Sequence, residues 1–236
     1  MPVYTYTTLD DPLATTNGTF AEGINAAGQI VGTYFTASGE HGFFLSGGAY
    51  TTLDAPLATN GTDAHGINAL GQIVGTYSNA SGGHGFFLSG ALYNTLNDPL
   101  ATMGTAANGI NDAGQIVGGY QNASGQHGFL FNPSNGTYTT LDDPLGAHGT
   151  SAQGINDAGQ IVGVYTDSND VGHGFLLSGG TYTTIDPPVV GTAANGNAKG
   201  INNAGQIVGS YFSGGRFHGF LFSGGTYTPP RRSLRH

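Results

Sequence analysis

Short runs of strand-forming residues alternate with turn sequences along the whole chain. The second of five similar segments shows the pattern, because it holds four such runs: Thr62 to Asn68, Gln72 to Tyr77, His84 to Ser89 and Leu92 to Asn97. Asn-x-x-Gly links the first two runs, and Ser-Gly-Gly or a close relative links the last two. Both are tight-turn sequences in which glycine supplies a positive φ, so each predicts a β-hairpin. Each segment is therefore expected to form a four-stranded antiparallel meander.

Two links in each segment are expected to be longer than these hairpin turns. In the second segment the link between the second and third runs spans 78–83, and the link into the next segment spans 98–104. The latter contains proline followed by Leu-Ala-Thr. Loops of this length can carry function.

Three motifs recur five times in the same order. Gly-Ile-Asn begins at positions 23, 66, 109, 154 and 200, Gln-Ile-Val-Gly at 29, 72, 115, 160 and 206, and His-Gly-Phe at 41, 84, 127, 173 and 218. Four-stranded units repeated at a nearly constant period are typical of a propeller. A β-solenoid is the competing architecture, but its coils are parallel, whereas two hairpins per unit require antiparallel strands. We predict an all-β, five-bladed β-propeller with four antiparallel strands per blade.

The ends of the chain predict how the ring closes. Residues 1–230 are expected to form a single propeller domain, with copies at about 19–60, 61–103, 104–148, 149–195 and 196–230. Before the first copy, Tyr6-Thr7-Thr8-Leu9-Asp10 is an isolated fourth strand, while the last copy ends in Tyr227-Thr228-Pro229-Pro230. Proline cannot donate to a strand ladder. We therefore expect the strand at 4–10 to complete the fifth blade, and the basic tail at 231–236 to be disordered.

Composition supports this fold class and excludes several partners. The chain has 43 Gly, 12 Tyr and 13 Phe, but only 8% charged residues and a net charge of −9. Since three of the five basic residues, Arg231, Arg232 and Arg235, lie in the last six positions, no basic stripe exists to bind nucleic acid. No apolar run reaches the roughly 18 residues of a membrane helix, so membrane insertion is not expected. There is no cysteine for a disulfide or a thiolate metal site, and residues 1–11 do not read as a signal peptide.

The sequence Gly-Ile-Asn-x-x-Gly-Gln-Ile-Val-Gly followed by His-Gly-Phe resembles the bacterial repeats called HAF, described as probable extracellular repeats. The resemblance covers residues 4 to 228, with Gly in place of the Ala of His-Ala-Phe. It implies an extracellular or cell-surface location and leaves the activity open. In length and blade count, though not in motif, the chain is also similar to five-bladed lectins of the tachylectin type.

The order of strands and links predicts one face that carries all the longer links. It receives the end of the second strand, the start of the third and the end of the fourth. The aromatic residues expected there are Tyr34, Tyr77, Tyr120, Tyr165 and Tyr211; the imidazoles are His41, His84, His127, His173 and His218; the carboxylates and amide are Asp10, Asp54, Asn97, Asp142 and Asp186.

Such a set suits a sugar, because an aromatic ring can stack on the C–H face while His and Asp bind hydroxyl groups. The structural alternative is that the tyrosine packs between blades, the histidine bonds to a neighbouring loop and the aspartate caps a turn. On the opposite face, Asn25, Asn68, Asn111, Asn156 and Asn202 are expected to form Asx-type turns, bonded across by the Gln of Gln-Ile-Val-Gly. The phenylalanines after each histidine, such as Phe86 and Phe87, are expected to pack between blades. The polar residues before Gly-Ile-Asn, namely Glu22, His65, Asn108, Gln153 and Lys199, are expected at the central channel.

Five equivalent sites favour binding over catalysis. An active site needs groups in distinct roles, and no nucleophile motif, metal-ligand cluster or cofactor motif is present. Equal weak sites on one rigid body gain avidity on a surface array of ligands. We therefore predict a multivalent lectin that binds glycans, without catalytic activity, metal or cofactor. The alternative is an extracellular scaffold or adhesion repeat that binds a protein partner.

Overall fold

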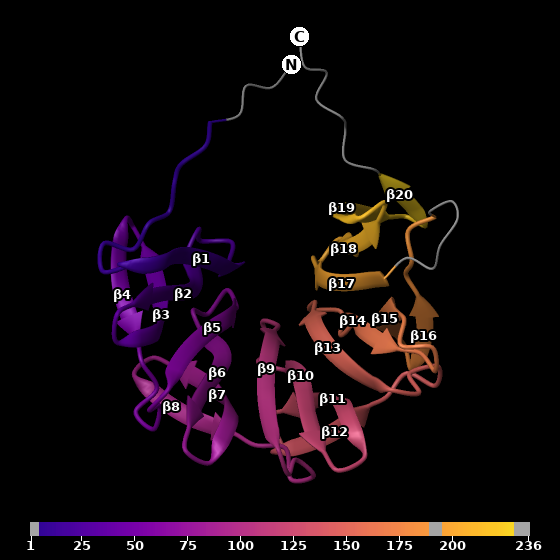
Figure 1. Ribbon diagram of the computed structural model, residues 1–236, viewed down its shortest axis with the longest axis horizontal. Helices are drawn as coiled ribbons and strands as arrows, with labels where there is room; N and C mark the ends of the chain where they lie inside the picture. The colour runs from indigo at the N-terminus through magenta and orange to yellow at the C-terminus, as the bar shows by residue number, and fades with distance from the viewer. Residues whose placement is uncertain (1–4, 189–194, 229–236) are drawn as a thin grey trace.

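A computed structural model describes residues 5–188 and 195–228 of the chain. These residues form twenty β-strands and no helix, so no helix capable of spanning a membrane occurs among them. The strands form five four-stranded meanders, blades 1 to 5 in chain order, which are arranged as an arc around a common centre (Figure 1). A single parallel bridge between Gly83 and Gly104 joins blades 2 and 3.

Each blade uses its strands in sequence order from the centre outward, with antiparallel pairing throughout. The innermost strands are β1 (Thr16–Ile24), β5 (Gly61–Ile67), β9 (Gly104–Ile110), β13 (Gly149–Ile155) and β17 (Asn195–Ile201). The second strands are β2 (Ile30–Thr36), β6 (Ile73–Asn79), β10 (Ile116–Asn122), β14 (Ile161–Thr166) and β18 (Ile207–Ser213). The third strands are β3 (Gly39–Ser46), β7 (Gly82–Ser89), β11 (Gly125–Asn132), β15 (Gly172–Ser178) and β19 (Arg216–Ser223). The outermost strands are β4 (Ala49–Leu53), β8 (Leu92–Leu96), β12 (Thr137–Leu141), β16 (Thr181–Thr184) and β20 (Thr226–Thr228).

The hydrophobic core lies between neighbouring blades. Phe86 is buried at the interface between blades 1 and 2, while Phe87 packs against the cluster between blades 2 and 3. The two consecutive phenylalanines point to opposite faces of β7, as the period of a strand requires. The expectation that these rings pack between blades is confirmed.

The asparagines that begin the inner turns also join the blades. Asn68 Oδ1 accepts the N–H groups of Leu70 and Gln72, while its Nδ2 donates to Gln72 Oε1 at 2.8 Å. The predicted Asx turn and its bond to glutamine are therefore confirmed. The same Nδ2 also donates 3.0 Å to the Asn111 carbonyl of the next blade. Asn25, Asn111 and Asn156 make the equivalent bond to the following blade.

The predicted link between second and third strands is shorter than expected. The sequence suggested a loop at 78–83, but β6 continues to Asn79 and β7 begins at Gly82. Asn79 Oδ1 accepts the Ser81 N–H at 2.8 Å, which makes a tight Asx turn. The long links of blades 1 to 3 are therefore those between blades, at 54–60, 97–103 and 142–148, which we call the interblade loops, whereas blade 4 keeps a longer link at 167–171 between its second and third strands.

The two ends of the arc do not meet in this structure (Figure 1). Within the expected closing strand at 4–10, the described residues 5–10 form no strand, and Tyr6 is 94% exposed. Instead, β20 is the fourth strand of blade 5, although it pairs with β19 at only three positions, against five between β3 and β4. The predicted basic tail at 231–236 lies outside the described residues.

Candidate functional site

The structure brings the tyrosine and the histidine of each repeat into direct contact. Tyr34 at the end of β2 lies opposite His41 on β3, and the two rings stack with centroids 5.2 Å apart. The equivalent stacked pairs are Tyr77–His84, Tyr120–His127, Tyr165–His173 and Tyr211–His218. The predicted convergence of tyrosine and histidine is thus present in all five blades.

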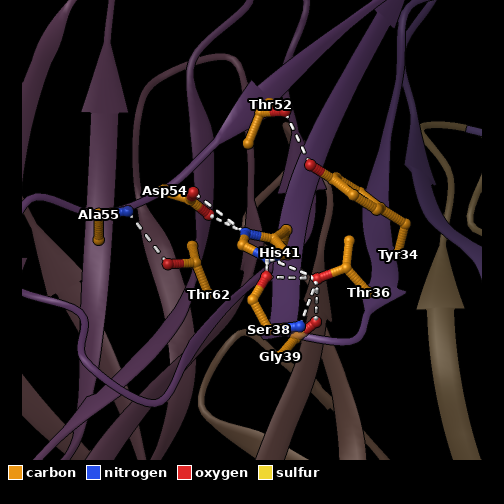
Figure 2. Close-up of polar contacts among 9 residues, drawn as sticks. All are labelled: Tyr34, Thr36, Ser38, Gly39, His41, Thr52, Asp54, Ala55 and Thr62. Atoms are coloured by element: carbon orange, nitrogen blue, oxygen red, sulfur yellow. Dashed lines mark hydrogen bonds and ion pairs between the residues drawn. The ribbon is translucent and has the colours of Figure 1, made fainter. Parts of the chain in front are cut away.

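The residue after the fourth strand, an aspartate in blades 1, 3 and 4 and Asn97 in blade 2, completes the group in the first four blades. His41 Nδ1 donates to Asp54 at 3.0 Å (Figure 2). The matching distances are 2.9 Å for His84–Asn97, 3.0 Å for His127–Asp142 and 2.6 Å for His173–Asp186. The Asp54 and Asp142 side chains are 50% and 47% exposed, so their carboxylates also face solvent.

The other imidazole nitrogen contacts the turn between the second and third strands. His41 Nε2 lies 3.2 Å from Thr36 Oγ1, and His127 Nε2 lies 2.9 Å from Ser124 Oγ. Each of these imidazole rings therefore contacts a polar partner at both nitrogens and stacks on a tyrosine ring. This geometry agrees with the structural alternative for the histidine, in which it fixes one turn to one interblade loop.

In blades 1 to 4 the tyrosines are not available as stacking platforms for a sugar. Tyr34 is only 2% exposed, and its hydroxyl bonds to Thr52 Oγ1 at 2.8 Å (Figure 2). Tyr77, Tyr120 and Tyr165 are each 3% exposed, and each bonds to a threonine on the fourth strand. The histidine covers one face of each ring and the core covers the rest, so the expected role of the tyrosine in ligand stacking has no geometric basis here.

Blade 4 replaces the serine or threonine partner with an acid. His173 Nε2 lies 3.5 Å from Asp167 Oδ2. The backbone N–H groups of Val171 and Asn169 donate to Asp167 and lower its pKa to about 2. Asp167 therefore serves the turn as a charged cap in addition to contacting the histidine.

Blade 5 lacks the acidic partner. Among the described residues, no carboxylate contacts His218, whose Nε2 lies 3.2 Å from the Ser213 carbonyl oxygen. Asp10, the predicted fifth acid, is exposed on the N-terminal segment and has no contact with His218. The structure therefore assembles four of the five predicted groups.

A polar pocket adjoins the group in blade 1. It has a volume of about 140 Å³ and is lined by Ser38 to His41, by Asp54, by residues 58–60 of the interblade loop, and by Gly61 and Thr62 at the start of β5. Glu40 contributes a carboxyl whose pKa is raised by burial and by the nearby Asp63. The pocket offers hydroxyl, amide and carboxylate groups for a polar, uncharged ligand.

A second polar cluster lies toward the central channel. His65 Nε2 contacts Asp63 at 3.0 Å, its Nδ1 contacts the Ala107 carbonyl at 3.0 Å, and Thr33 donates to Asp63. The cluster thereby links blades 1, 2 and 3. The sequence placed His65 at the channel, but Asp63 went unnoticed because no other copy has an acid at its position, and Thr33 went unnoticed because its position is a threonine only in the first two copies.

In blade 3, Ser124 and Asp142 contact the two ring nitrogens of His127. This arrangement resembles the serine–histidine–aspartate triad of hydrolases. However, the Ser124 hydroxyl donates to Asn122 Oδ1 at 2.6 Å, as part of the turn. The hydroxyl is therefore held in the turn and has a second acceptor besides the imidazole. No group of three or more His, Asp or Glu side chains suited to a metal ion occurs in the described part of the chain.

Comparison with solved structures identifies propellers. TolB from Acinetobacter baumannii matches with a TM-score of 0.68 and 13% identity over 88% of this chain and 52% of that chain, so this chain spans about half of it. The Aleuria aurantia lectin, a mutant in complex with Fucα1-6GlcNAc, matches with a TM-score of 0.51 and 14% identity over 91% of this chain and 80% of the lectin. Acylaminoacyl peptidase matches with a TM-score of 0.57 and 11% identity, over 91% of this chain and 39% of the peptidase.

These likenesses establish a propeller-like fold of four-stranded antiparallel sheets. No family model matches the sequence, and no curated protein matches it. The resemblance to HAF repeats therefore stays an expectation from the motifs.

Proposed function

We propose that the protein is a multivalent carbohydrate-binding protein with up to five similar sites on the face of the interblade loops. The observation that carries this proposal is the recurrent histidine–carboxylate pair, whose acid stays about half exposed in blades 1 and 3 (50% and 47%). In blade 1 the pair lines the polar pocket of about 140 Å³. The likeness in fold to a lectin solved with Fucα1-6GlcNAc supports a sugar as ligand.

The roles within the site differ from those expected from sequence. The carboxylate, as in Asp54, accepts hydrogen bonds from ligand hydroxyl groups through its exposed oxygens. The histidine holds that carboxylate in place and the tyrosine supports the histidine, so both are positioning residues. The turn hydroxyls, such as Ser38 and Thr36, supply further polar contacts.

The proposal describes a binding protein without catalytic activity or cofactor. It is supported by the repetition of one group in several blades and by the bond of the Ser124 hydroxyl to Asn122 within the turn. An extracellular or cell-surface location, which suits the binding of surface glycans, stays a prediction from the resemblance to HAF repeats.

A protein partner is the second candidate, and one observation favours it. The leucine that follows proline in the N-terminal segment and in each of the three interblade loops is exposed, namely Leu13 (57%), Leu57 (61%), Leu100 (58%) and Leu145 (62%). Equally spaced apolar side chains on one face suit a protein surface that repeats in the same way.

A glycan array followed by calorimetry tests the first candidate. The variant Asp54→Asn/Asp142→Asn/Asp186→Asn is expected to lose most glycan binding with little change in melting temperature, because blade 2 already folds with Asn97 bonded to His84. The matched control Leu57→Ser/Leu100→Ser/Leu145→Ser is expected to bind glycans normally. Loss of glycan binding only in the leucine variant would refute the assignment of the site to the carboxylates, and the absence of any glycan ligand would refute the first candidate.

We also propose that the working form is a closed five-bladed ring, in which Tyr6 to Asp10 replaces β20 beside β19. Three groups in blade 5 lack the partners that their equivalents have. Among the described residues, the Tyr211 hydroxyl has no threonine partner, His218 has no acid, and Asn202 Nδ2 bonds only to Gln206. The repeat supplies a matching partner for each group: Thr8 for the Tyr211 hydroxyl, Asp10 for His218, and the Asn25 carbonyl for Asn202 Nδ2.

The N-terminal segment is already docked as the end of a preceding blade. Leu9 and Ala14 pack against the cluster of blade 1 that contains Tyr34 and Phe43. The equivalent residues of the next copy, Leu53 and Ala58, belong in the same way to the cluster between blades 1 and 2. The Asp11 N–H donates to Thr19 Oγ1 at 2.9 Å, matching the 3.0 Å bond from Ala55 to Thr62. Closure therefore requires only the residues before Leu9 to move onto β19, and it would give blade 5 a histidine–carboxylate pair of its own.

A further inference from the structure

A small pocket lies at the outer rim between blade 1 and blade 2. It has a volume of about 100 Å³ and is lined by Ala55, Pro56 and Leu57 of the interblade loop and by Tyr77, Phe86, Tyr93, Asn94 and Thr95 of blade 2. It shares no residue with the polar pocket proposed for glycans. A cavity of this size holds several waters or a small organic molecule.

Three other copies place an aspartate where this pocket has Ala55. Asp11, Asp98 and Asp143 are 3%, 3% and 5% exposed, so their side chains are buried at this point. Each carboxylate accepts the N–H of the leucine two residues later, at 2.8, 2.8 and 2.9 Å respectively. The position is therefore built to hold a carboxylate.

The backbone around Ala55 is unchanged by the missing carboxylate. The Ala58 N–H donates to the Ala55 carbonyl at 2.9 Å, as Ala101 does to Asp98 at 3.0 Å. The Ala55 N–H donates to Thr62 Oγ1 at 3.0 Å, and the Asp98 N–H donates to Thr105 Oγ1 at the same distance. Only the side chain of the aspartate is absent, so the space and the donors around it persist.

Two donors at this pocket have no acceptor. Among the described residues, the Leu57 N–H has no partner, although its equivalents at Leu13 and Leu100 donate to aspartate. The Tyr93 hydroxyl is shielded from solvent and also has no hydrogen-bond partner. A buried donor such as the Tyr93 hydroxyl is costly without an acceptor, and a ligand that supplies the acceptor removes this cost.

We propose that the rim pocket binds a small carboxylate, whose carboxyl group takes the place of the missing aspartate side chain. The ligand oxygens accept from the Leu57 N–H and the Tyr93 O–H, and its short apolar part packs against Pro56 and Leu57. Because Ala55 occurs in this copy while Asp11, Asp98 and Asp143 fill the equivalent place, the site is specific to blade 2 among the first four blades.

Titration with propionate, followed by the backbone amide signals in nuclear magnetic resonance spectra, tests this proposal. In the wild-type protein the Leu57 amide signal is expected to shift with propionate and to saturate, while the Leu100 amide signal stays in place. In Ala55→Asp the Leu57 shift is expected to disappear, because the new carboxylate fills the pocket. In Asp98→Ala the Leu100 amide is expected to respond as well, which would give a second equivalent site.

Three results would overturn the proposal: no saturable shift of the Leu57 amide, an undiminished shift in Ala55→Asp, or equal binding of propionamide and propionate. The last would mean that the pocket accepts any oxygen acceptor. Tyr93→Phe should weaken propionate at least several-fold without unfolding the protein, since the phenol has no partner to lose. Folding of each variant is verified by its melting temperature.

Discussion

His65 is the residue whose environment most clearly couples charge to stability. Burial alone would lower the pKa of His65, but the hydrogen bond and the charge of Asp63 outweigh it and raise the pKa, with smaller contributions from the Ala107 carbonyl and Glu22. Burial would likewise raise the pKa of Asp63, yet His65 and Thr33 lower it overall. The charged forms of both residues are thus favoured by folding, and they join three blades near the channel.

The sign of the pH effect follows from these directions. A histidine whose pKa is raised on folding contributes stability below its unfolded pKa of about 6.5 and loses it as pH rises through the folded pKa. Asp63 contributes stability above its unfolded pKa of about 3.9 and loses it as pH falls through its lower folded pKa. We predict that the free energy of unfolding, measured with urea, decreases from pH 6 to pH 9, and that His65→Asn flattens this decrease. Asparagine is chosen because Asn108 occupies the equivalent position in the next blade. If the free energy of unfolding of His65→Asn changed with pH as steeply as that of the wild type, the assignment of this pH effect to His65 would be wrong.

At the same scale, the residues of the candidate site were largely predictable, but their roles were not. The repeat order alone placed tyrosine, histidine and aspartate on one face, and the contacts of His41 with Tyr34 and Asp54 bear this out. The bond from Tyr34 to Thr52 could not be foreseen, because it depends on the outer strand covering the ring. That contact buries the tyrosine, so its ring offers no open face for stacking.

At the scale of the strand, the glycine of Gln-Ile-Val-Gly leaves the space in which the first three strands of a blade pack closely together. A Cβ at Gly118 would lie 1.9 Å from the Ala106 carbonyl oxygen and 2.8 Å from the Phe129 ring. β9 and β10 change register beside this glycine, which is the mark of a bulge. The sequence predicted the strands within a residue or two, but it could not indicate that a ring from the third strand needs this space.

Replacing this glycine should therefore be far worse than replacing a glycine in open space. We predict that Gly118→Ala lowers the free energy of unfolding by about 3 kcal/mol, because neither the carbonyl nor the core ring can retreat. Gly83→Ala is the control: a Cβ there meets nothing within 4 Å, so the change should stay within about 0.5 kcal/mol. Chemical denaturation measures both, and similar losses in the two variants would refute the steric argument.

At the scale of the whole molecule, the five copies and their four-stranded units could be predicted because each copy repeats the same turns. Closure could not, because it depends on which of two segments pairs with β19. The exposed apolar side chains of the end blades, Phe20 and Ile24 on β1 and Val208 on β18, lie where inner blades pack against a neighbour. Closing the ring would bury surfaces of this kind and contribute hydrophobic stabilisation.

Disulfide trapping distinguishes the open from the closed arrangement, and the chain has no cysteine of its own to interfere. In the structure Leu221 pairs with Thr228, whereas in the closed ring it would pair with Thr7, as Phe44 pairs with Thr51 in blade 1. Opposed residues in an antiparallel pair lie about 4.5–5.5 Å apart between their Cα atoms, within the range of a disulfide.

We predict that Leu221→Cys/Thr7→Cys oxidises readily, and that in the triple variant with Thr228→Cys the bond to residue 7 dominates. Trypsin cleavage after Lys199 and Arg216 reads out the result, because only the bond to residue 7 holds the first and the last fragments together before reduction. A triple variant linked solely between residues 221 and 228 would show that β20 keeps its place and that the N-terminal strand does not close the ring.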